Sequence, residues 1–129
     1  MKLGFIGTGK ITESVVTGIS SSKIKYSKIL VSPRNLYIAK KLSKKNKKVS
    51  IGKSNQEIIN SCDWIFLAVT PTVGEKIIKT LKFKSNQTII SFISTITLPR
   101  LKKLINVKAK IFRAIPCLLY TSPSPRDCL

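Results

Sequence analysis

Residues 2–19 read KLGFIGTGKITESVVTGI, and the order of segments within this stretch decides the fold. A short apolar run over Leu3–Ile6 has the composition of a strand, and Gly7-Thr8-Gly9 then breaks it. Branched residues recur at helical spacing immediately afterwards, at Ile11, Val15 and Ile19. A strand, a glycine turn and a helix in this order place backbone N–H groups where they can hold a phosphate. Thr12 stands where a third glycine or an alanine is usual, so the motif alone is incomplete.

Strand-like and helix-like segments alternate through the rest of the chain. We predict further strands at Lys28–Ser32, Lys48–Ile51, Asp63–Val69, Thr88–Phe92 and Lys110–Ala114. We predict helices over residues 10–20, 34–45, 55–61, 73–81 and 97–105. This alternation indicates βαβ units and therefore an α/β fold, a parallel sheet with helices on both faces. Right-handed crossovers favour the doubly wound, nucleotide-binding topology of the Rossmann fold, with about six strands in one domain.

The ends and faces of several elements follow from local signals. Asp63–Val69 is almost uninterrupted apolar sequence, as expected of a central strand buried on both faces. Ser54 followed by Glu57 forms a capping box that opens a helix. Pro71 is expected to end a strand and to stiffen the loop that leaves it. Three apolar residues of the 34–45 helix should face inward: Leu36, Ala39 and Leu42.

Composition limits the class of protein. A chain of 129 residues with 43% hydrophobic content suits one globular domain with a single core. The sequence has no apolar run as long as a membrane span, and its first residues do not resemble a signal peptide. Histidine is absent and the three cysteines show no paired spacing, which excludes Cys/His metal sites and histidine acid–base catalysis. We therefore expect a cytoplasmic protein with no metal and no membrane partner.

The net charge of +19 admits two interpretations. A basic domain can bind nucleic acid through its phosphates. The alternative is a lysine-rich surface without a specific partner. The lysines are spread over nearly every segment, and the few aromatic residues do not alternate with them as stacking platforms do. We favour the second interpretation and expect no nucleic-acid partner.

The last residues differ from the rest in composition. Residues 117–129 contain no lysine, and Ser-Pro-Ser-Pro is typical of a loop rather than of a core element. A docking tail is one interpretation. CLLYTSPSPRD also resembles translated adapter sequence, and we favour this second interpretation. We therefore expect a dinucleotide-binding domain over residues 1–116 and an irregular, non-native tail over 117–129.

The residues around the glycine turn predict a cofactor. Gly7 permits a tight turn, Gly9 lets the backbone approach a diphosphate, and Thr12 is expected to loosen the packing of helix on strand slightly. The second strand ends in Val-Ser-Pro-Arg-Asn without the carboxylate that selects NAD. Ser32 and Arg34 there suit a 2′-phosphate, so we predict NADP(H) in preference to NAD(H). The alternative is that Arg34 merely begins a solvated helix face.

Two further segments end strands at the same edge of the predicted sheet. Leu67–Pro71 follows the buried central strand, and Ser91–Ser94 closes the next strand along the chain. Ligands of such sheets bind at the carboxyl ends of the strands. We expect Ser91–Ser94 to face the nicotinamide half of the cofactor.

Five segments in order carry a resemblance to a known family: GFIGTGKI, VSPRN, DWIFLAVTP, IISFISTITLPRLKKL and IFRAIP. Over Met1–Pro116 the chain resembles the N-terminal domain of pyrroline-5-carboxylate reductases. The resemblance implies that Ile6–Ile11 bind the cofactor's phosphates and that Ser32 contacts the 2′-phosphate. It also implies that Asn55 lies near the adenosine ribose, and that Ala68–Pro71 and Phe92–Ser94 line the nicotinamide half. With Arg34, the candidate cofactor-binding residues are Ile6, Gly7, Thr8, Gly9, Lys10, Ile11, Ser32, Arg34, Asn55, Ala68, Val69, Thr70, Pro71, Phe92, Ile93 and Ser94.

The resemblance also implies a reaction. These reductases transfer a hydride from NAD(P)H to the imine carbon of 1-pyrroline-5-carboxylate and so form L-proline. Their substrate pocket and dimer interface come from a helical C-terminal domain to which nothing in this chain corresponds. We therefore expect a small imine substrate and a homo-oligomer only for a longer protein, and no turnover by the 129 residues alone. No catalytic residue is assigned.

The chain departs from the family pattern at three places. Lys10-Ile11-Thr12 replaces Asn-Met-Ala, Thr70 replaces lysine, and Ile93-Ser94-Thr95 replaces Ala-Ala-Gly. Alternatives are therefore another NADP oxidoreductase, either similar to 3-hydroxyacid dehydrogenases or a deazaflavin-linked NADP reductase, and a nucleotide-binding module without catalysis.

Overall fold

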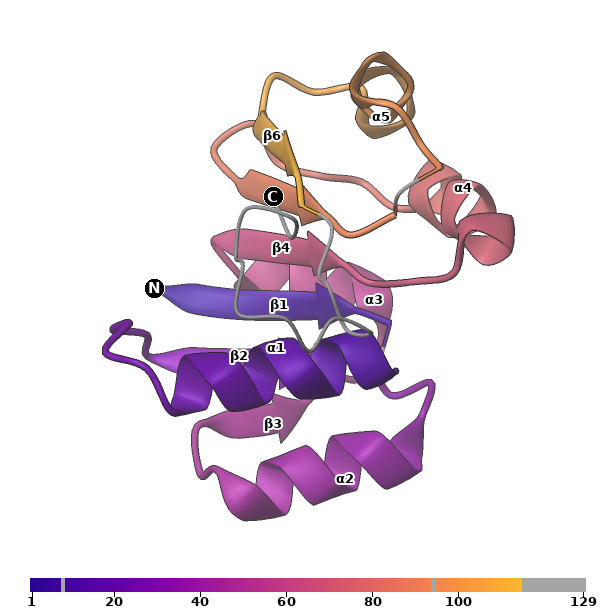
Figure 1. The fold of residues 1–129 in the computed structure, drawn as a ribbon. Coiled ribbons are helices and arrows are strands. Elements are labelled where there is room, and N and C mark those ends of the chain that lie inside the picture. Colours follow the sequence, from indigo (N-terminus) through magenta and orange to yellow (C-terminus); the bar gives the residue numbers. More distant parts are fainter. Residues whose placement is uncertain (8, 94, 115–129) are drawn as a thin grey trace, which may run out of the picture.

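The sheet contains six parallel strands and is flanked by five helices in the computed structural model, which describes residues 1–7, 9–93 and 95–114 (Figure 1). The first half consists of β1 (Lys2–Ile6), α1 (Lys10–Ser20), β2 (Lys28–Val31), α2 (Leu36–Lys45), β3 (Val49–Ile51) and α3 (Asn55–Ser61). The second half consists of β4 (Trp64–Leu67), α4 (Pro71–Thr80), β5 (Thr88–Ser91), α5 (Leu98–Ile105) and β6 (Lys110–Arg113).

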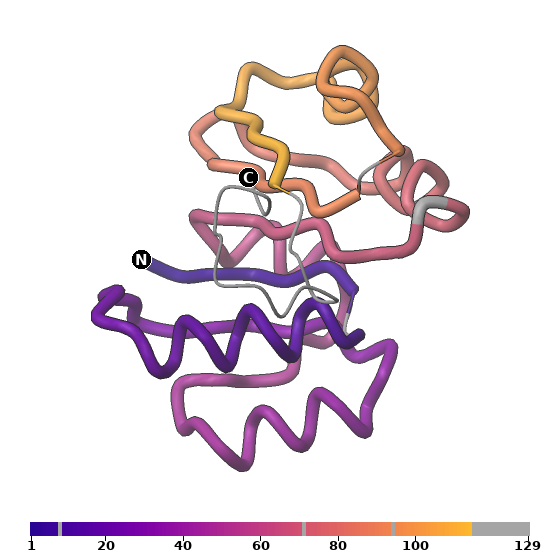
Figure 2. Tube along the Cα trace, viewed as in Figure 1, coloured from indigo at the N-terminus to yellow at the C-terminus, as the bar shows by residue number. Residues whose placement is uncertain are grey.

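The strand order is β3-β2-β1-β4-β5-β6, and every neighbouring pair is parallel. The first half of the chain therefore builds outward from β1 in one direction, and the second half builds outward from β4 in the other (Figure 2). This order confirms the predicted doubly wound α/β fold. The direction reverses between β1 and β4, and a ligand crevice is expected where their carboxyl ends meet.

Helices cover the two faces of the sheet in two groups. Val16 of α1 and Leu42 of α2 pack with Phe5 of β1 in one buried cluster. The other face carries α3, α4 and α5, whose buried residues pack with Ile65 and Leu67 of β4. The predicted burial of the central strand is confirmed, since Ile65, Phe66 and Leu67 are all buried.

Two predicted helix faces are wrong by a small rotation. The buried stripe of α1 is Thr12, Val16 and Ile19, so Ile19 of the predicted face lies in it, whereas Ile11 and Val15 are half-buried beside it. In α2, Ala39 and Leu42 are buried as predicted, but Leu36 is 50% exposed. Leu36 is the first residue of its helix, and side chains there lean toward the helix N-terminus and away from the core. Both errors have the same cause: the spacing of apolar residues shows that a helix has a buried face, but packing against the sheet decides which residues lie in it.

Two element ends also differ from the prediction. Pro71 is the first residue of α4, a position that suits proline because its missing N–H has no helical partner there. Pro71 therefore begins a helix instead of stiffening a loop. Ser54 caps α3 as predicted, since its hydroxyl accepts a hydrogen bond from the Glu57 N–H at 3.2 Å. The Glu57 carboxylate accepts from the N–H of Lys53 at 3.4 Å, one residue before the expected partner.

The predicted boundary at residue 116 and the tail over 117–129 lie outside the described residues. Within residues 1–7, 9–93 and 95–114, no helix combines the length and the apolar character needed to cross a membrane.

Cys62 follows α3 and is 5% exposed within the core cluster on that face of the sheet. Burial, with a smaller contribution from the neighbouring carboxylate of Asp63, raises the pKa of the Cys62 thiol from 9.0 to about 11. The native protein therefore holds this proton more tightly than the unfolded chain does. The resulting stabilisation is complete below about pH 9 and is lost as the pH rises through about 11.

We expect the free energy of unfolding to fall more steeply above pH 9 in the wild type than in Cys62→Ala. The additional slope should approach about 1.4 kcal/mol per pH unit, because one thiol proton is released on unfolding in this range. Urea unfolding at several pH values above and below that point measures the difference. The packing lost in Cys62→Ala lowers the free energy of unfolding equally at every pH. If the plots of unfolding free energy against pH stay parallel for the two proteins, the raised pKa of Cys62 is contradicted.

Candidate functional site

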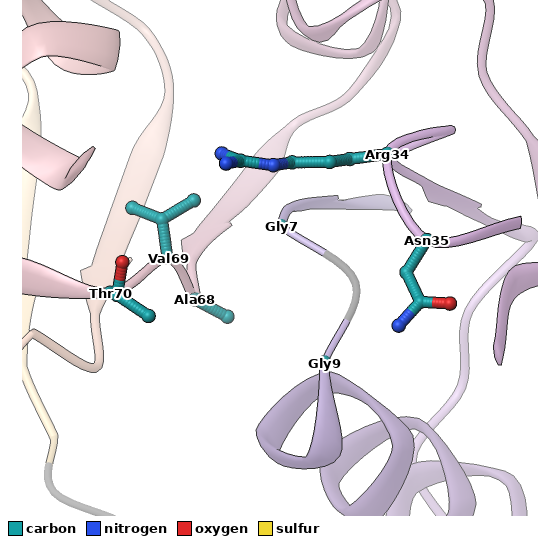
Figure 3. Close-up of a pocket in the computed structure, with 7 residues that line it drawn as sticks. All are labelled: Gly7, Gly9, Arg34, Asn35, Ala68, Val69 and Thr70. Carbon is teal, nitrogen blue, oxygen red and sulfur yellow. The ribbon is translucent and has the colours of Figure 1, made fainter.

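Two adjoining cavities lie at the carboxyl edge of the sheet, on either side of the start of α1. The first has a volume of about 340 Å³ and is lined by Gly7, Gly9, Arg34, Asn35, Ala68, Val69 and Thr70 (Figure 3). The second has a volume of about 300 Å³ and is lined by Gly9, Lys10, Ile11, Ala68, Val69, Thr70, Phe92 and Ile93. The two share Gly9 and the segment Ala68–Thr70, so together they follow the edge from β2 to β5.

The glycine turn has a backbone that only glycine can adopt at its first position. Gly7 has φ +96°, and a Cβ there would lie 2.5 Å from the carbonyl oxygen of Ala68. Ala68 is itself fixed, because its N–H donates to the Ile6 carbonyl at 2.8 Å. Gly7 therefore fits against the end of β4 without room for a side chain.

Gly9 contributes space instead. Its φ of −124° is open to any residue, and a Cβ there would meet nothing within 4 Å. Gly9 is also the N-cap of α1, and a glycine N-cap has no side-chain oxygen to accept from the first N–H groups of the helix. These donors and the positive end of the helix dipole favour an anion beside Gly9.

Arg34 supplies a cation to the first cavity. Its side chain extends over Gly7 toward Val69, and Asn35 lies on the Gly9 side of the same space (Figure 3). The Arg34 N–H donates to the hydroxyl of Ser32 at 3.3 Å, and Ser32 is only 2% exposed beneath the turn. Among the described residues that line this cavity there is no carboxylate. The arrangement suits a ligand with a phosphate beside Arg34.

The second cavity is mainly apolar. Ile11, Phe92 and Ile93 form much of its wall, and Lys10 is the one charged side chain among the described residues that line it. Phe92 is held by the core, because its ring stacks on Phe66 with centroids 5.8 Å apart. An apolar wall with few polar groups is typical of a pocket for a flat organic ring.

Most of the predicted site residues lie together at this edge. Ile6 is fully buried below the turn, and Ser32 is buried below Arg34. Asn55 begins α3 and lines neither cavity, and its buried Oδ1 has no hydrogen-bond partner among the described residues. The remaining predicted residues that the structure describes line one or both cavities, except that the side chain of Pro71 is not described. Thr8 and Ser94 lie outside the described residues.

Two residues have roles that the sequence did not reveal. Asn35 lines the first cavity and caps α2, accepting a hydrogen bond from the Ile38 N–H at 3.3 Å. The available signal was the preference of asparagine for the position just before a helix. An N-cap that follows a strand of this sheet lies at the edge where the cavity opens. Thr12 was expected to loosen the packing of α1. Instead its buried hydroxyl donates to the carbonyl of Gly7 at 2.6 Å and ties the helix to the turn.

Comparison with known proteins identifies relatives of this chain. The family described as "NADP oxidoreductase coenzyme F420-dependent" matches residues 2–95. Pyrroline-5-carboxylate reductase 3 of Danio rerio is 30% identical over an alignment of 125 residues, and the match covers 92% of this chain and 43% of the relative. The chain thus spans less than half the length of this curated relative.

Solved structures support the same resemblance. The 1-pyrroline-5-carboxylate reductase of Streptococcus pyogenes is 28% identical with a TM-score of 0.74, over 90% of this chain and 42% of that chain. The Plasmodium falciparum pyrroline carboxylate reductase, solved with NADP bound, is 26% identical with a TM-score of 0.73 over the same shares. Prephenate dehydrogenase of A. aeolicus has a TM-score of 0.75 and 16% identity, over 95% of this chain and 43% of that chain. At this identity the likeness shows the fold alone. The predicted resemblance to pyrroline-5-carboxylate reductases is confirmed.

The two glycines of the turn should respond differently to the same substitution. Gly7→Ala should lower the free energy of unfolding by about 1–3 kcal/mol from backbone strain, with a further loss from the contact with Ala68. Gly9→Ala should lower the free energy of unfolding by about 1 kcal/mol or less, which is the effect of replacing a residue at the N-cap of a helix. Thermal and urea unfolding of the two variants test this, and equal losses would contradict the geometry of the turn.

Proposed function

Because this chain belongs to the family of NADP oxidoreductases described as coenzyme F420-dependent, we propose that residues 1–114 form the NADP(H)-binding part of a reductase. The observation that carries the proposal is the pair of cavities that meet at Gly9. One has a cation and the other an apolar wall, and a helix N-terminus lies between them. A dinucleotide has the same sequence of groups, with phosphates between two ring systems.

The residues present fit this cofactor. Gly9 leaves open space beside the first N–H groups of α1, where a diphosphate requires close approach of the backbone. The adenosine half then lies in the first cavity, beside Arg34 and Asn35. Asn55 has a buried Oδ1 without a described partner, and a ribose hydroxyl is a donor of the kind it needs. The nicotinamide half lies against Phe92 in the second cavity.

Arg34 supports a preference for NADP(H) over NAD(H). A guanidinium presents a planar fork of donors that matches a phosphate, whereas a carboxylate at this position would repel it. The described residues that line the first cavity include Arg34 and no acid. Ser32 fixes the backbone of Arg34 from below and in this way sets where the side chain begins.

The proposed reaction is reduction of the imine bond of 1-pyrroline-5-carboxylate to L-proline, a step of proline biosynthesis. It rests on the resemblance to pyrroline-5-carboxylate reductases, which are more than twice as long as this chain. When bound, the cofactor supplies the hydride. Ile11, Phe92 and Ile93 form an apolar wall against which the reacting end of the cofactor lies, and the glycine turn orients that end. Cofactor binding is proposed for this chain, and turnover and oligomerisation for the whole protein.

A deazaflavin-linked NADP reductase is the second candidate. The description of the matching family names coenzyme F420, which is a deazaflavin. The apolar second cavity suits the ring of a deazaflavin as well as a small imine. The test is hydride transfer from NADPH to oxidised F420 by the whole protein, measured as loss of F420 absorbance. Activity in this assay separates this candidate from imine reduction.

Removal of the Arg34 side chain should reveal cofactor selectivity. We expect Arg34→Ala to weaken NADPH binding by about 1.5–3 kcal/mol, the range for hydrogen bonds to charged groups, and to leave NADH binding nearly unchanged. Calorimetric titration of both cofactors measures this. Lys44→Ala on the exposed face of α2 removes the same charge outside both cavities and controls for general attraction.

A second variant tests the shared part of the site. Gly9→Val fills the open space beside α1, so binding of both cofactors should be lost while circular dichroism stays native.

Equal losses for NADPH and NADH in Arg34→Ala would refute the selectivity. Full NADPH affinity in a folded Gly9→Val protein would refute the proposed position of the diphosphate.

A further inference from the structure

The side chain of Thr12 makes a hydrogen bond that joins two elements. Its hydroxyl donates to the Gly7 carbonyl oxygen at 2.6 Å, and Thr12 is fully buried. A threonine inside a helix usually bonds to a carbonyl three or four residues earlier in its own helix. Gly7 lies five residues earlier, before α1 begins at Lys10, so this bond fastens the helix to the end of β1.

The bond also determines which groups can face the first cavity. Gly7 lines that cavity, and an anion there requires N–H donors rather than a carbonyl oxygen. Because the Gly7 oxygen accepts from a fully buried hydroxyl, it is directed into the interface between α1 and the sheet. Its partial negative charge is thereby kept away from the site proposed for the diphosphate.

Gly7 is constrained on its other side as well. The carbonyl of Ala68 occupies the place that a Cβ of Gly7 would need, so the turn cannot relax toward β4. The hydroxyl of Thr12 and the end of β4 therefore hold Gly7 between them. Without the hydroxyl, a buried carbonyl would lack its donor, and rotation of its peptide plane toward the cavity would become favourable.

We propose that Thr12 is a positioning residue that organises the glycine turn for cofactor binding through the Gly7 carbonyl. The inference rests on the proposed function, because it assumes that the cofactor's phosphates lie beside this turn. Glycine or alanine at this position has no donor to offer. Thr12 thus adds to the turn a fixed point that the more usual residues do not provide.

Three variants of the 129-residue chain test the role of the hydroxyl. Thr12→Val keeps the shape and removes the donor, and we expect the dissociation constant for NADPH to rise about tenfold. Thr12→Ser keeps the donor and should bind within about twofold of the wild type. Val16→Ala, one turn further along the same buried stripe, is the matched control. It should lower the melting temperature and leave NADPH affinity within about twofold of the wild type.

A second measurement does not depend on cofactor. The carbonyl ¹³C chemical shift of Gly7 reports the hydrogen bond directly, so it should move in Thr12→Val and return in Thr12→Ser. An unchanged shift in Thr12→Val overturns the inference, as does unchanged NADPH affinity in that variant, or an equal loss of affinity in Val16→Ala. Absence of NADPH binding by the wild type overturns the proposed function and the positioning role together, while the chemical shift still decides whether the hydroxyl holds the turn.

Discussion

The position of Gly7 is the constraint on which the rest of the site depends. Its φ of +96° and the absence of space beside the Ala68 carbonyl turn the chain sharply where β1 ends. Helix α1 can therefore begin at Lys10, with its first N–H groups at the sheet edge. Both cavities border this helix start and the end of β4. A looser connection would move the helix N-terminus away from the place where the strand order reverses.

The strand order then distributes different chemistry to the two sides of the turn. Arg34 and Asn35 follow β2 on one side, and Phe92 and Ile93 follow β5 on the other. The first pair is polar and the second apolar, although both lie at the same edge of one sheet. A doubly wound sheet can in this way hold a ligand whose two ends differ in charge, because each half of the chain supplies its own end.

The sequence predicted what depends on local pattern. Buried strands appeared as apolar runs, and the cap of α3 was evident from Ser54 and Glu57. Errors arose where packing decides between neighbours, as in the buried stripe of α1 and at exposed Leu36. The role of Thr12 could not be predicted, because it depends on the direction of the Gly7 carbonyl, which no spacing encodes. The cofactor contacts of all the candidate residues, Ser32 and Asn55 included, stay predictions.

Selectivity at this site has to come from geometry rather than from charge. The chain has 24 basic and 5 acidic residues, and Glu13 and Glu75 already face Lys41 at 3.7 Å and Arg100 at 2.8 Å. Such a protein attracts any anionic nucleotide, but between exposed charges this attraction is screened within about 8 Å at physiological ionic strength. Arg34 borders the first cavity but is itself exposed, so its charge is screened as well, and what sets it apart from the other cations is its place beside the glycine turn. In the proposed function the general positive charge favours encounter, and Arg34 and the fixed turn at Gly7 are the features expected to select among nucleotides.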